Sequence, residues 1–423
     1  MDERRQALMA RAVGGTLQER GLALWAEGRE TPWKLASVWS SSHPALKRLN
    51  SRKRRVVVET LWFLLRHHAV LSVLAGNDSP EILWRAALVG QGLAPESVGP
   101  EEQWVRVATG DVGPFLEARD AVAAVALLGS LTPWLAERLV SALGEGALDF
   151  VRASNERAPF CLRVKRKQGQ RQRVIGQFRG RGIRCGPTKL APDGLVLEER
   201  LDLDDEPLFR KGWLEPQDEG SQLLAELVDP KGVVLDLCAG AGGKTLAMAD
   251  RADRMVATDV RRGALDELEQ RLTRARQRAE VYLLGADGAL PAGLGGLQAD
   301  RVLVDAPCSG SGVLRRYPQH RWMITPERVA ELVLLQSQTL DRAAAAVAPG
   351  GRLIYGTCSV LPSENDDVVD AFLARHPDFT ELPASSVLGT GYGQRLRLAP
   401  HTHNTDGFFG AVMVRESGIA PRN

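Results

Sequence analysis

The stretch LDLCAGAGGKT, residues 235–245, decides how this chain is expected to fold. It continues an apolar run, GVV, and leads into KTLAMADRA, which favours a helix. A buried strand that passes through a glycine-rich turn into a helix is typical of sheets that bind a nucleotide-like cofactor. Gly240, Gly242 and Gly243 carry no side chain, so the backbone of this turn is predicted to approach the ligand closely.

Downstream of this stretch, apolar runs with strand character alternate with longer helical patterns. This alternation predicts an α/β fold with a mainly parallel sheet, helices on both faces and a Rossmann-like domain over residues 215–418. The predicted strands are RMVATD (254–259), EVYLLG (280–285), DRVLVDAP (300–307) and GRLIYG (351–356), with a closing hairpin of RLRLAP (395–400) and GFFGAVMVR (407–415). The predicted helices are 261–277, 326–347 and 363–376.

Upstream, the sequence changes character twice. Residues 1–145 are predicted to form a helical N-terminal domain, because 52–71 carry apolar residues at helical spacing. Residues 148–214 are predicted to form a small α+β module with short β-like pieces divided by Gly, Pro and basic residues. The pieces are PFCLRVK (159–165), RVIGQF (173–178) and GLVLEE (194–199).

Composition narrows the class of protein. The 423 residues suit two or three domains, and we find no apolar run near the roughly 18 residues of a membrane span and no secretory signal at the N-terminus. Five cysteines, an odd number, are scattered without metal-ligand spacing, which argues against a disulfide framework and against zinc. We therefore expect a cytoplasmic, monomeric protein with free thiols, no metal and no membrane partner.

The basic residues are unevenly distributed. Eleven Lys or Arg and no Asp or Glu lie between Arg157 and Lys189, although the net charge of the chain is only +2. A charge run is often a solvated face, but this one exceeds what solvation needs, which favours contact with a nucleic acid. The candidate RNA-binding residues are Arg163, Lys165, Arg166, Lys167, Arg171, Arg173, Arg179 and Arg181.

Two acids complete the candidate cofactor site. Asp259 ends a predicted strand 19 residues after Gly240, where an acid is placed to bind ribose hydroxyls, and Asp287 follows the next strand and is predicted to reach an adenine edge. Turn capping is the alternative for both. The P-loop spacing is absent, so an ATPase is not predicted. The candidate cofactor-binding residues are Cys238, Ala239, Gly240, Ala241, Gly242, Gly243, Lys244, Asp259, Asp287 and Asp305.

Two cysteines follow predicted strands, in VDAPCSGSGVLRR (304–316) and YGTCSVLPSEND (355–366). Ligands bind at the carboxyl ends of parallel strands, so Asp305, Cys308 and Cys358 are expected to face one site. Packing is the alternative for a free cysteine, but these two lie in loops rich in Gly, Ser and Pro.

Two thiols and an acid suit methylation of a pyrimidine carbon. Carbon 5 of cytosine attacks the methyl sulfonium of S-adenosylmethionine only after a thiolate has added to carbon 6. A carboxyl kept protonated in a partly desolvated pocket relieves the charge on the ring nitrogen, and Asp305 is placed for this. The second thiol is available to help release the product.

The ordered motifs carry a family resemblance. PQDEGSQL (216–223), LDLCAGAGGKT, DAPCSGSG, YGTCSVLPSEN and HNTDGFFGAVMVR (403–415) together resemble the RNA cytosine-carbon-5 methyltransferases, in particular their bacterial RsmB/Sun (Fmu) branch. The resemblance covers about 209–415. NERAPFCLRV (155–164) resembles the entry to the family's RNA-binding module, and 50–66 more weakly resembles its N-terminal helical domain.

The resemblance implies roles for single residues. Cys358 of the Thr-Cys motif is the expected nucleophile, and Cys308 of the Pro-Cys motif the residue that helps release product. Asp305 would orient the target base, and Lys244 would line the cofactor and base pocket. The chain departs from the family pattern at Ala241, which makes the loop less rigid, and at Lys165, which stands where an RNA-contacting Asn is usual.

The expected function is therefore formation of 5-methylcytosine in ribosomal RNA, on a cytosine unstacked from its neighbours. A tRNA methyltransferase is one alternative. A non-catalytic RNA-binding assembly factor on the same fold is the other, although a binder needs neither thiol.

Overall fold

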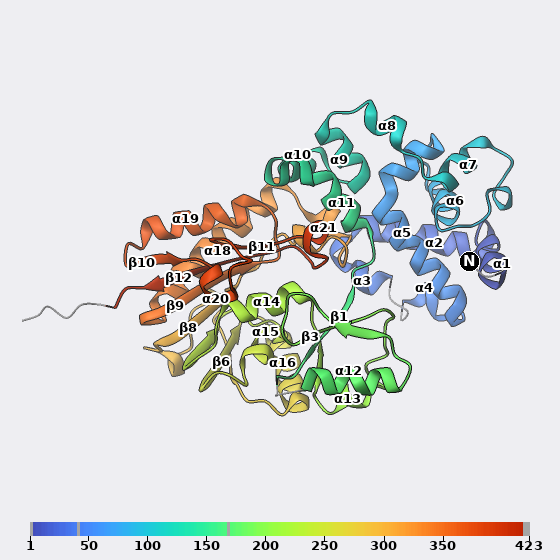
Figure 1. Cartoon of the computed structure of the whole chain (residues 1–423). Helices are drawn as coiled ribbons and strands as arrows, with labels where there is room; N and C mark the ends of the chain where they lie inside the picture. The colour runs from blue at the N-terminus through green and yellow to red at the C-terminus, as the bar shows by residue number, and fades with distance from the viewer. Residues whose placement is uncertain (1–2, 40–42, 167–169, 418–423) are drawn as a thin grey trace, which may run out of the picture. The chain divides into compact units, whose positions relative to one another are not determined.

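The structure of the chain is a computed structural model that describes residues 3–39, 43–166 and 170–417. The chain divides into two compact units: unit 1 comprises Met1–Arg157 and Val313–Pro326, and unit 2 comprises Ala158–Gly312 and Glu327–Asn423 (Figure 1). The division expected from the sequence, into three domains with boundaries near 145 and 214, stays a prediction.

Unit 1 is helical, as the sequence predicts. Its longest helix, α5 (Ser51–Ala75), begins at Asn50, whose side chain accepts from the amide of Lys53 at 2.9 Å, and ends at Gly76 in a left-handed conformation. The remaining helices are α1 (Glu3–Ala10), α2 (Gly15–Glu30), α3 (Leu35–Val38), α4 (Pro44–Lys47), α6 (Pro80–Gly90), α7 (Glu102–Thr109), α8 (Gly113–Glu117), α9 (Ala121–Gly129), α10 (Pro133–Leu143), α11 (Ala147–Asn155) and α17 (His320–Met323).

Among the described helices, α5 is long and apolar enough to span a membrane, and the bent pair Ala121–Gly129 and Pro133–Asn155 passes the same test only if it counts as one span. The sequence analysis expected no such segment. In the structure Val57, Leu61 and Leu64 on this helix are fully buried in the core of unit 1. Their burial accounts for the apolar character of α5 as that of a core helix.

The segment Val313–Pro326 belongs to unit 1, although the sequence analysis included it in the Rossmann-like domain. Arg321 anchors it: the side chain is fully buried and donates to the carbonyls of Gly129 (2.8 Å) and Ser154 (3.1 Å). Burial lowers the pKa of Arg321 to about 9. The chain thus leaves unit 2 after Gly312, at the end of the loop that carries Cys308 (the first cysteine loop), and returns to it at Glu327, in the helix α18.

The small module in unit 2 is an antiparallel sheet in the order β2-β3-β1-β4, with strands β1 (Phe160–Val164), β2 (Cys185–Pro187), β3 (Gly194–Leu197) and β4 (Leu214–Pro216). The predicted pieces at 159–165 and 194–199 are strands. The prediction for 173–178 was wrong, because this segment lies within the helix α12 (Gln170–Gly180). Val174, Ile175 and Phe178 are buried on one face of this helix. Their spacing is helical, but in a run this short it is not distinguishable from the pattern of a buried strand. The small helix α13 (Pro207–Arg210) precedes β4.

The large sheet has the order β10-β12-β9-β8-β5-β6-β7, with β11 paired to β12. The pairs among β5 to β9 are parallel, and β12 is antiparallel to β9, β10 and β11. The predicted α/β class and the closing hairpin are confirmed. The strands are β5 (Val233–Asp236), β6 (Arg254–Asp259), β7 (Glu280–Leu283), β8 (Ala299–Asp305), β9 (Val347–Thr357), β10 (Phe379–Leu382), β11 (Leu396–Leu398) and β12 (Phe408–Arg415).

Helices cover both faces of the large sheet (Figure 1). One core joins the sheet to the helices α18 and α19, and the other joins it to α14 and α15. The chain winds outward from β5 to β7 and then in the other direction from β8 to β9, so the carboxyl ends of β5 and β8 flank a topological switch point. The helices are α14 (Glu219–Leu227), α15 (Gly243–Met248), α16 (Arg262–Ala275), α18 (Pro326–Ala345), α19 (Asp366–Arg375), α20 (Ser385–Leu388) and α21 (Pro400–His403).

Candidate active site

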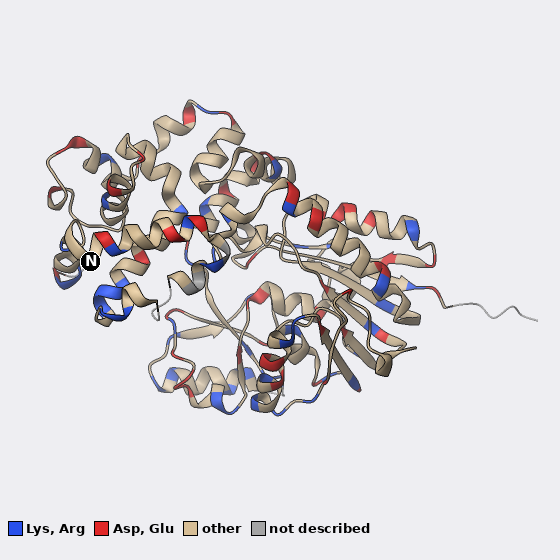
Figure 2. Cartoon of the chain, turned by 180° about the vertical axis from the view of Figure 1, so that it is seen from behind, with Lys and Arg blue, Asp and Glu red and all other residues tan. Residues whose placement is uncertain are grey.

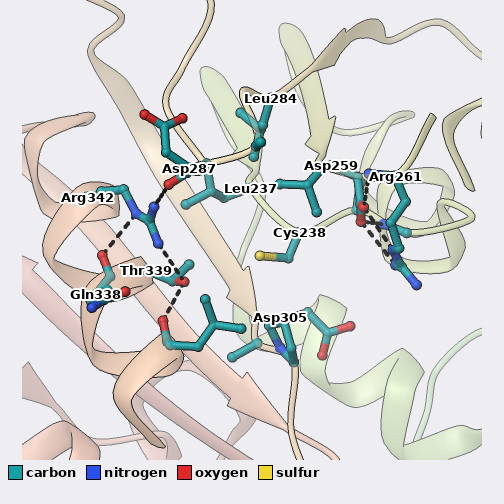
Figure 3. Close-up of a pocket in the computed structure, with 18 of the residues that line it drawn as sticks. Leu237, Cys238, Asp259, Arg261, Leu284, Asp287, Asp305, Gln338, Thr339 and Arg342 are labelled. Carbon is teal, nitrogen blue, oxygen red and sulfur yellow. Dashed lines mark hydrogen bonds and ion pairs between the residues drawn. The ribbon is translucent and has the colours of Figure 1, made fainter. Parts of the chain in front are cut away.

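A pocket of about 770 Å³ opens at the switch point, within unit 2. Figure 3 shows Asp259 and Arg261 on one side of it, Asp287 and Arg342 on the other, and the sulfur of Cys238 between them. The pocket is lined by segments that follow β5, β6, β7 and β8, and by one face of α18. Its volume lies in the range of pockets that hold small molecules and cofactors.

The glycine loop forms the floor of this pocket. Cys238, Ala239, Gly240 and Ala241 line it, whereas the predicted residues Gly242, Gly243 and Lys244 do not. Gly242 has φ +81°, and a Cβ built there would lie 2.0 Å from the side chain of Leu268. The need for glycine at 242 is therefore one of close packing between the turn and α16.

Asp259 lies in the wall of the pocket, where the sequence places it. Its carboxylate accepts from the amide of Gly240 at 2.8 Å and from the backbone and guanidinium of Arg261. Burial opposes ionisation, but these hydrogen bonds hold the pKa of Asp259 below its usual range. The carboxylate thus ties the glycine loop to β6 and carries a negative charge at the pocket.

Asp287 also lines the pocket, and its side chain is exposed. The guanidinium of Arg342 donates to the Asp287 carbonyl and to the carbonyl of Gln338 at 3.1 Å. The sequence analysis missed the residues of α18 that close this side. They are Leu335, Gln338, Thr339 and Arg342. Their spacing places them on a single face of the helix. This pattern indicates a cofactor site only when the helix is known to lie beside the switch point.

Lys244 and Asp305 form an ion pair of 2.6 Å between Nζ and a carboxylate oxygen. The Lys244 ammonium lies 5.5 Å from the ring centroid of Phe408. Burial lowers the pKa of Lys244, but the charge and hydrogen bond of Asp305, with smaller contributions from Asp236 and Cys358, leave that pKa raised. Asp305 lines the pocket, so the pair links the pocket to the neighbourhood of Cys358.

The thiols of Cys308 and Cys358 lie in contact. The sulfurs of Cys308 and Cys358 lie 3.3 Å apart, one after β8 and one after β9, and both side chains are half-buried. The hydrogen bond that Cys308 makes to Cys358 and burial, together with the charges of Cys358 and Glu364, raise the pKa of the Cys308 thiol well above its usual range. Neither cysteine lines the 770 Å³ pocket, so the pair of sulfurs is a site separate from that pocket.

Glycines allow this approach. A Cβ at Gly312 would lie 2.8 Å from the carbonyl of Cys358 and 2.4 Å from that of Gly407. The amide of Gly312 donates to Cys358 O at 2.9 Å, which fixes the first cysteine loop against the second.

Lys and Arg are spread over many helices and loops of the chain (Figure 2), and most of the basic run is engaged within the protein. The prediction that Arg163 contacts RNA needs correction: the side chain is 5% exposed and donates to Gln217 at 2.9 Å. Other residues of the run also have partners: Lys165 with Asp250, Arg166 with Asp193 and Glu226, Arg171 with the Ala191 carbonyl, Arg181 with Glu206, and Arg184 with Glu198 and Glu199.

Arg173 and Arg179 on α12 are exposed, and Lys167 lies outside the described residues. RNA contact by this run, other than at Arg163, stays a prediction.

All five cysteines are free thiols. Among the described residues, His, Cys, Asp and Glu form no cluster that could hold a metal ion.

Comparison with known proteins places this geometry in context. Residues 223–414 match the family described as 16S rRNA methyltransferase RsmB/F, and residues 132–204 match the ferredoxin-like domain of RsmF/B-like methyltransferases. The ribosomal RNA small subunit methyltransferase B of Salmonella typhi is 37% identical over 289 residues, 67% of this chain and 66% of the relative. The match thus spans slightly less than two thirds of that relative.

Two solved structures share the fold. The crystal structure of PH0851 covers 93% of this chain with a TM-score of 0.71 and 23% identity, and the alignment includes 98% of that protein. The methyltransferase homolog protein from Pyrococcus horikoshii covers 70% of this chain with a TM-score of 0.60 and 25% identity, over 99% of its own length.

Proposed function

The chain belongs to the RsmB/F family of 16S rRNA methyltransferases, and from this premise we propose that it methylates carbon 5 of a cytosine in ribosomal RNA. S-adenosylmethionine supplies the methyl group, and Cys358 is the covalent nucleophile. The observation that carries the proposal is the meeting of two free thiols, 3.3 Å apart, beside a cofactor-sized pocket at the switch point.

The pocket suits S-adenosylmethionine. Asp259 presents a carboxylate in the pocket wall whose acceptor positions are filled by the amides of Gly240 and Arg261 and by the Arg261 guanidinium. Ribose hydroxyls would therefore bind in place of that exposed guanidinium. Asp287 and the apolar Leu284 also line the pocket and would hold the adenine. When bound, the sulfonium supplies an electrophilic methyl group at the end of the pocket that Asp305 lines.

The reaction at the base follows from the neighbours of Cys358. The thiolate adds to carbon 6 of cytosine, and the ring nitrogen takes a proton from the Lys244–Asp305 pair, whose atoms are 2.6 Å apart. Carbon 5 then takes the methyl group, which leaves S-adenosylhomocysteine as the by-product. Water takes the proton from carbon 5, the bond from sulfur to carbon 6 breaks with its electron pair returning to Cys358, and the ring nitrogen returns its proton to the Lys244–Asp305 pair.

Methyl transfer to RNA from a strain that lacks the gene tests the proposal. We expect purified protein to methylate unassembled 16S rRNA and bisulfite sequencing to reveal one new 5-methylcytosine. Cys358→Ser should give none, with Cys185→Ser as the matched control because that half-buried thiol lies in the small module. A methylated tRNA with unmodified rRNA would overturn the substrate assignment, and RNA binding without methylation would leave a non-catalytic assembly factor.

A further inference from the structure

Glu364 joins the two cysteine loops. It ends the short turn Pro362–Glu364 and is fully buried. One carboxylate oxygen accepts from the amide of Ser309 at 2.7 Å and from Gln336 Nε2 at 3.1 Å. The other accepts from the hydroxyls of Ser309 at 2.5 Å and Ser359 at 2.6 Å. A single side chain therefore binds the residue after Cys308, the residue after Cys358 and the helix α18.

The donors to Glu364 are all neutral. Within the part of the chain that the structure describes, no Lys, Arg or His forms an ion pair with this carboxylate. Four hydrogen bonds satisfy the two oxygens of an ionised carboxylate, the state that accepts without donating. The charge is thus stabilised in place but not cancelled.

The two sulfurs have different neighbours. Cys308 contacts the sulfur of Cys358, and the residue after it, Ser309, donates its amide to Glu364, whose charge helps to raise the pKa of the Cys308 thiol. Lys244, which Asp305 holds in place, interacts electrostatically with Cys358. The surroundings of the two sulfurs are therefore unequal.

We propose that Glu364 is a positioning residue that clamps the two cysteine loops together and, through the carboxylate that it holds against Ser309, keeps the hydrogen on Cys308, so that Cys308 is the donor in the contact between the two sulfurs. The inference rests on the proposed covalent mechanism and deepens it. Cys308 then donates its S–H to the Cys358 sulfur across the 3.3 Å contact. When the bond from carbon 6 to sulfur breaks, its electron pair returns to Cys358, and the same S–H stabilises the departing thiolate. This gives Cys308 a role in product release.

Alkylation of Cys308 tests the charge directly, without RNA or methyl donor. In a Cys358→Ser background, the rate of reaction of Cys308 with iodoacetamide is followed across a pH series by peptide mass spectrometry. Glu364→Gln keeps the shape and removes the charge, so the midpoint of the profile should fall by about one pH unit. Glu364→Asp should restore most of the shift. Asp366→Asn, which removes a charge that pairs with Arg395 and Arg397, should leave the midpoint unchanged.

An unchanged midpoint in folded Glu364→Gln would overturn the inference. If Glu364→Gln does not fold, Glu364→Asp and Ser309→Ala decide: both keep the charge and must keep the high midpoint, and a fall in either would contradict the proposed role of the charge. In the chain with both thiols, Glu364→Gln should also slow the formation of the RNA adduct at neutral pH more than at high pH. A shifted alkylation profile with no adduct under any condition would remove the proposed function and leave the charge asymmetry standing.

Discussion

The two cysteine loops and the basic run Arg157–Lys189 use charge in opposite ways. In the loops, Glu364 is buried among neutral donors and its charge remains available to the thiols. In the basic run, Arg166 and Arg181 are each matched by carboxylates. The difference teaches that a charge left uncancelled in the interior points to chemistry, whereas a charge run in the sequence can serve mainly to hold a module together.

The largest effect is expected on the side of the loops. Cys358→Ser should lower methyl transfer by a factor on the order of 10⁴ or more, because a hydroxyl is a far weaker nucleophile than a thiolate. The rate is measured with labelled methyl donor and 16S rRNA. Activity within tenfold of the unmodified protein would show that this thiol makes no essential bond.

The second largest effect is expected in the basic run, on the stability of the protein. Arg163→Ala should lower the free energy of unfolding by about 3 kcal/mol, because it empties a buried site and leaves the buried side chain of Gln217 without its donor. Chemical denaturation measures the change. The exposed Arg173→Ala is the matched control and should change stability by less than about 0.5 kcal/mol. Equal stability of the two variants would contradict the structural role of Arg163.

A third prediction concerns the cofactor wall. Asp259→Ala should weaken S-adenosylmethionine binding by about 1–3 kcal/mol, the scale of a hydrogen bond to a charged group. Calorimetry on the folded variant checks this, with Asp266→Ala on the exposed face of α16 as the control. Unchanged affinity would mean that Asp259 serves only to tie the glycine loop to Arg261.

The smallest effect is expected where the basic run is exposed. Substituting Arg173 and Arg179 together by Gln should lower RNA affinity and reduce the slope of log affinity against log salt by about 1.5. Cofactor affinity should stay the same. An unchanged salt slope would mean that α12 presents only a solvated face to water.

The strand-end residues were predictable because topology places them. A strand that ends in a parallel sheet delivers the next residues to one edge whatever their side chains are, so Asp259 and Asp305 line the pocket as expected, whereas Cys358 follows β9 at the same edge but does not line it. The glycine loop followed for the same reason as far as Ala241. Gly242, Gly243 and Lys244 do not line the pocket, and Gly242 packs against Leu268.

Three features were not predictable in the same way. The strand assigned to 173–178 is a helix because a short apolar run fits both periods. The burial of Arg163 depends on β4 and Gln217, which lie about 50 residues further along the chain. The transfer of Val313–Pro326 to unit 1 depends on Arg321 finding carbonyl acceptors in distant helices. Each needs tertiary partners that no local pattern records.

The division of labour between the two thiols is the central claim, and trapping of the covalent intermediate tests it most directly. Cys308→Ser, incubated with 16S rRNA and S-adenosylmethionine, should transfer methyl and then stall, so a denaturation-resistant protein–RNA adduct accumulates. Cys358→Ser should give no adduct. An adduct trapped by Cys358→Ser instead would reverse the roles of the two sulfurs, and retained methylation by both variants with no adduct in either would contradict the covalent mechanism.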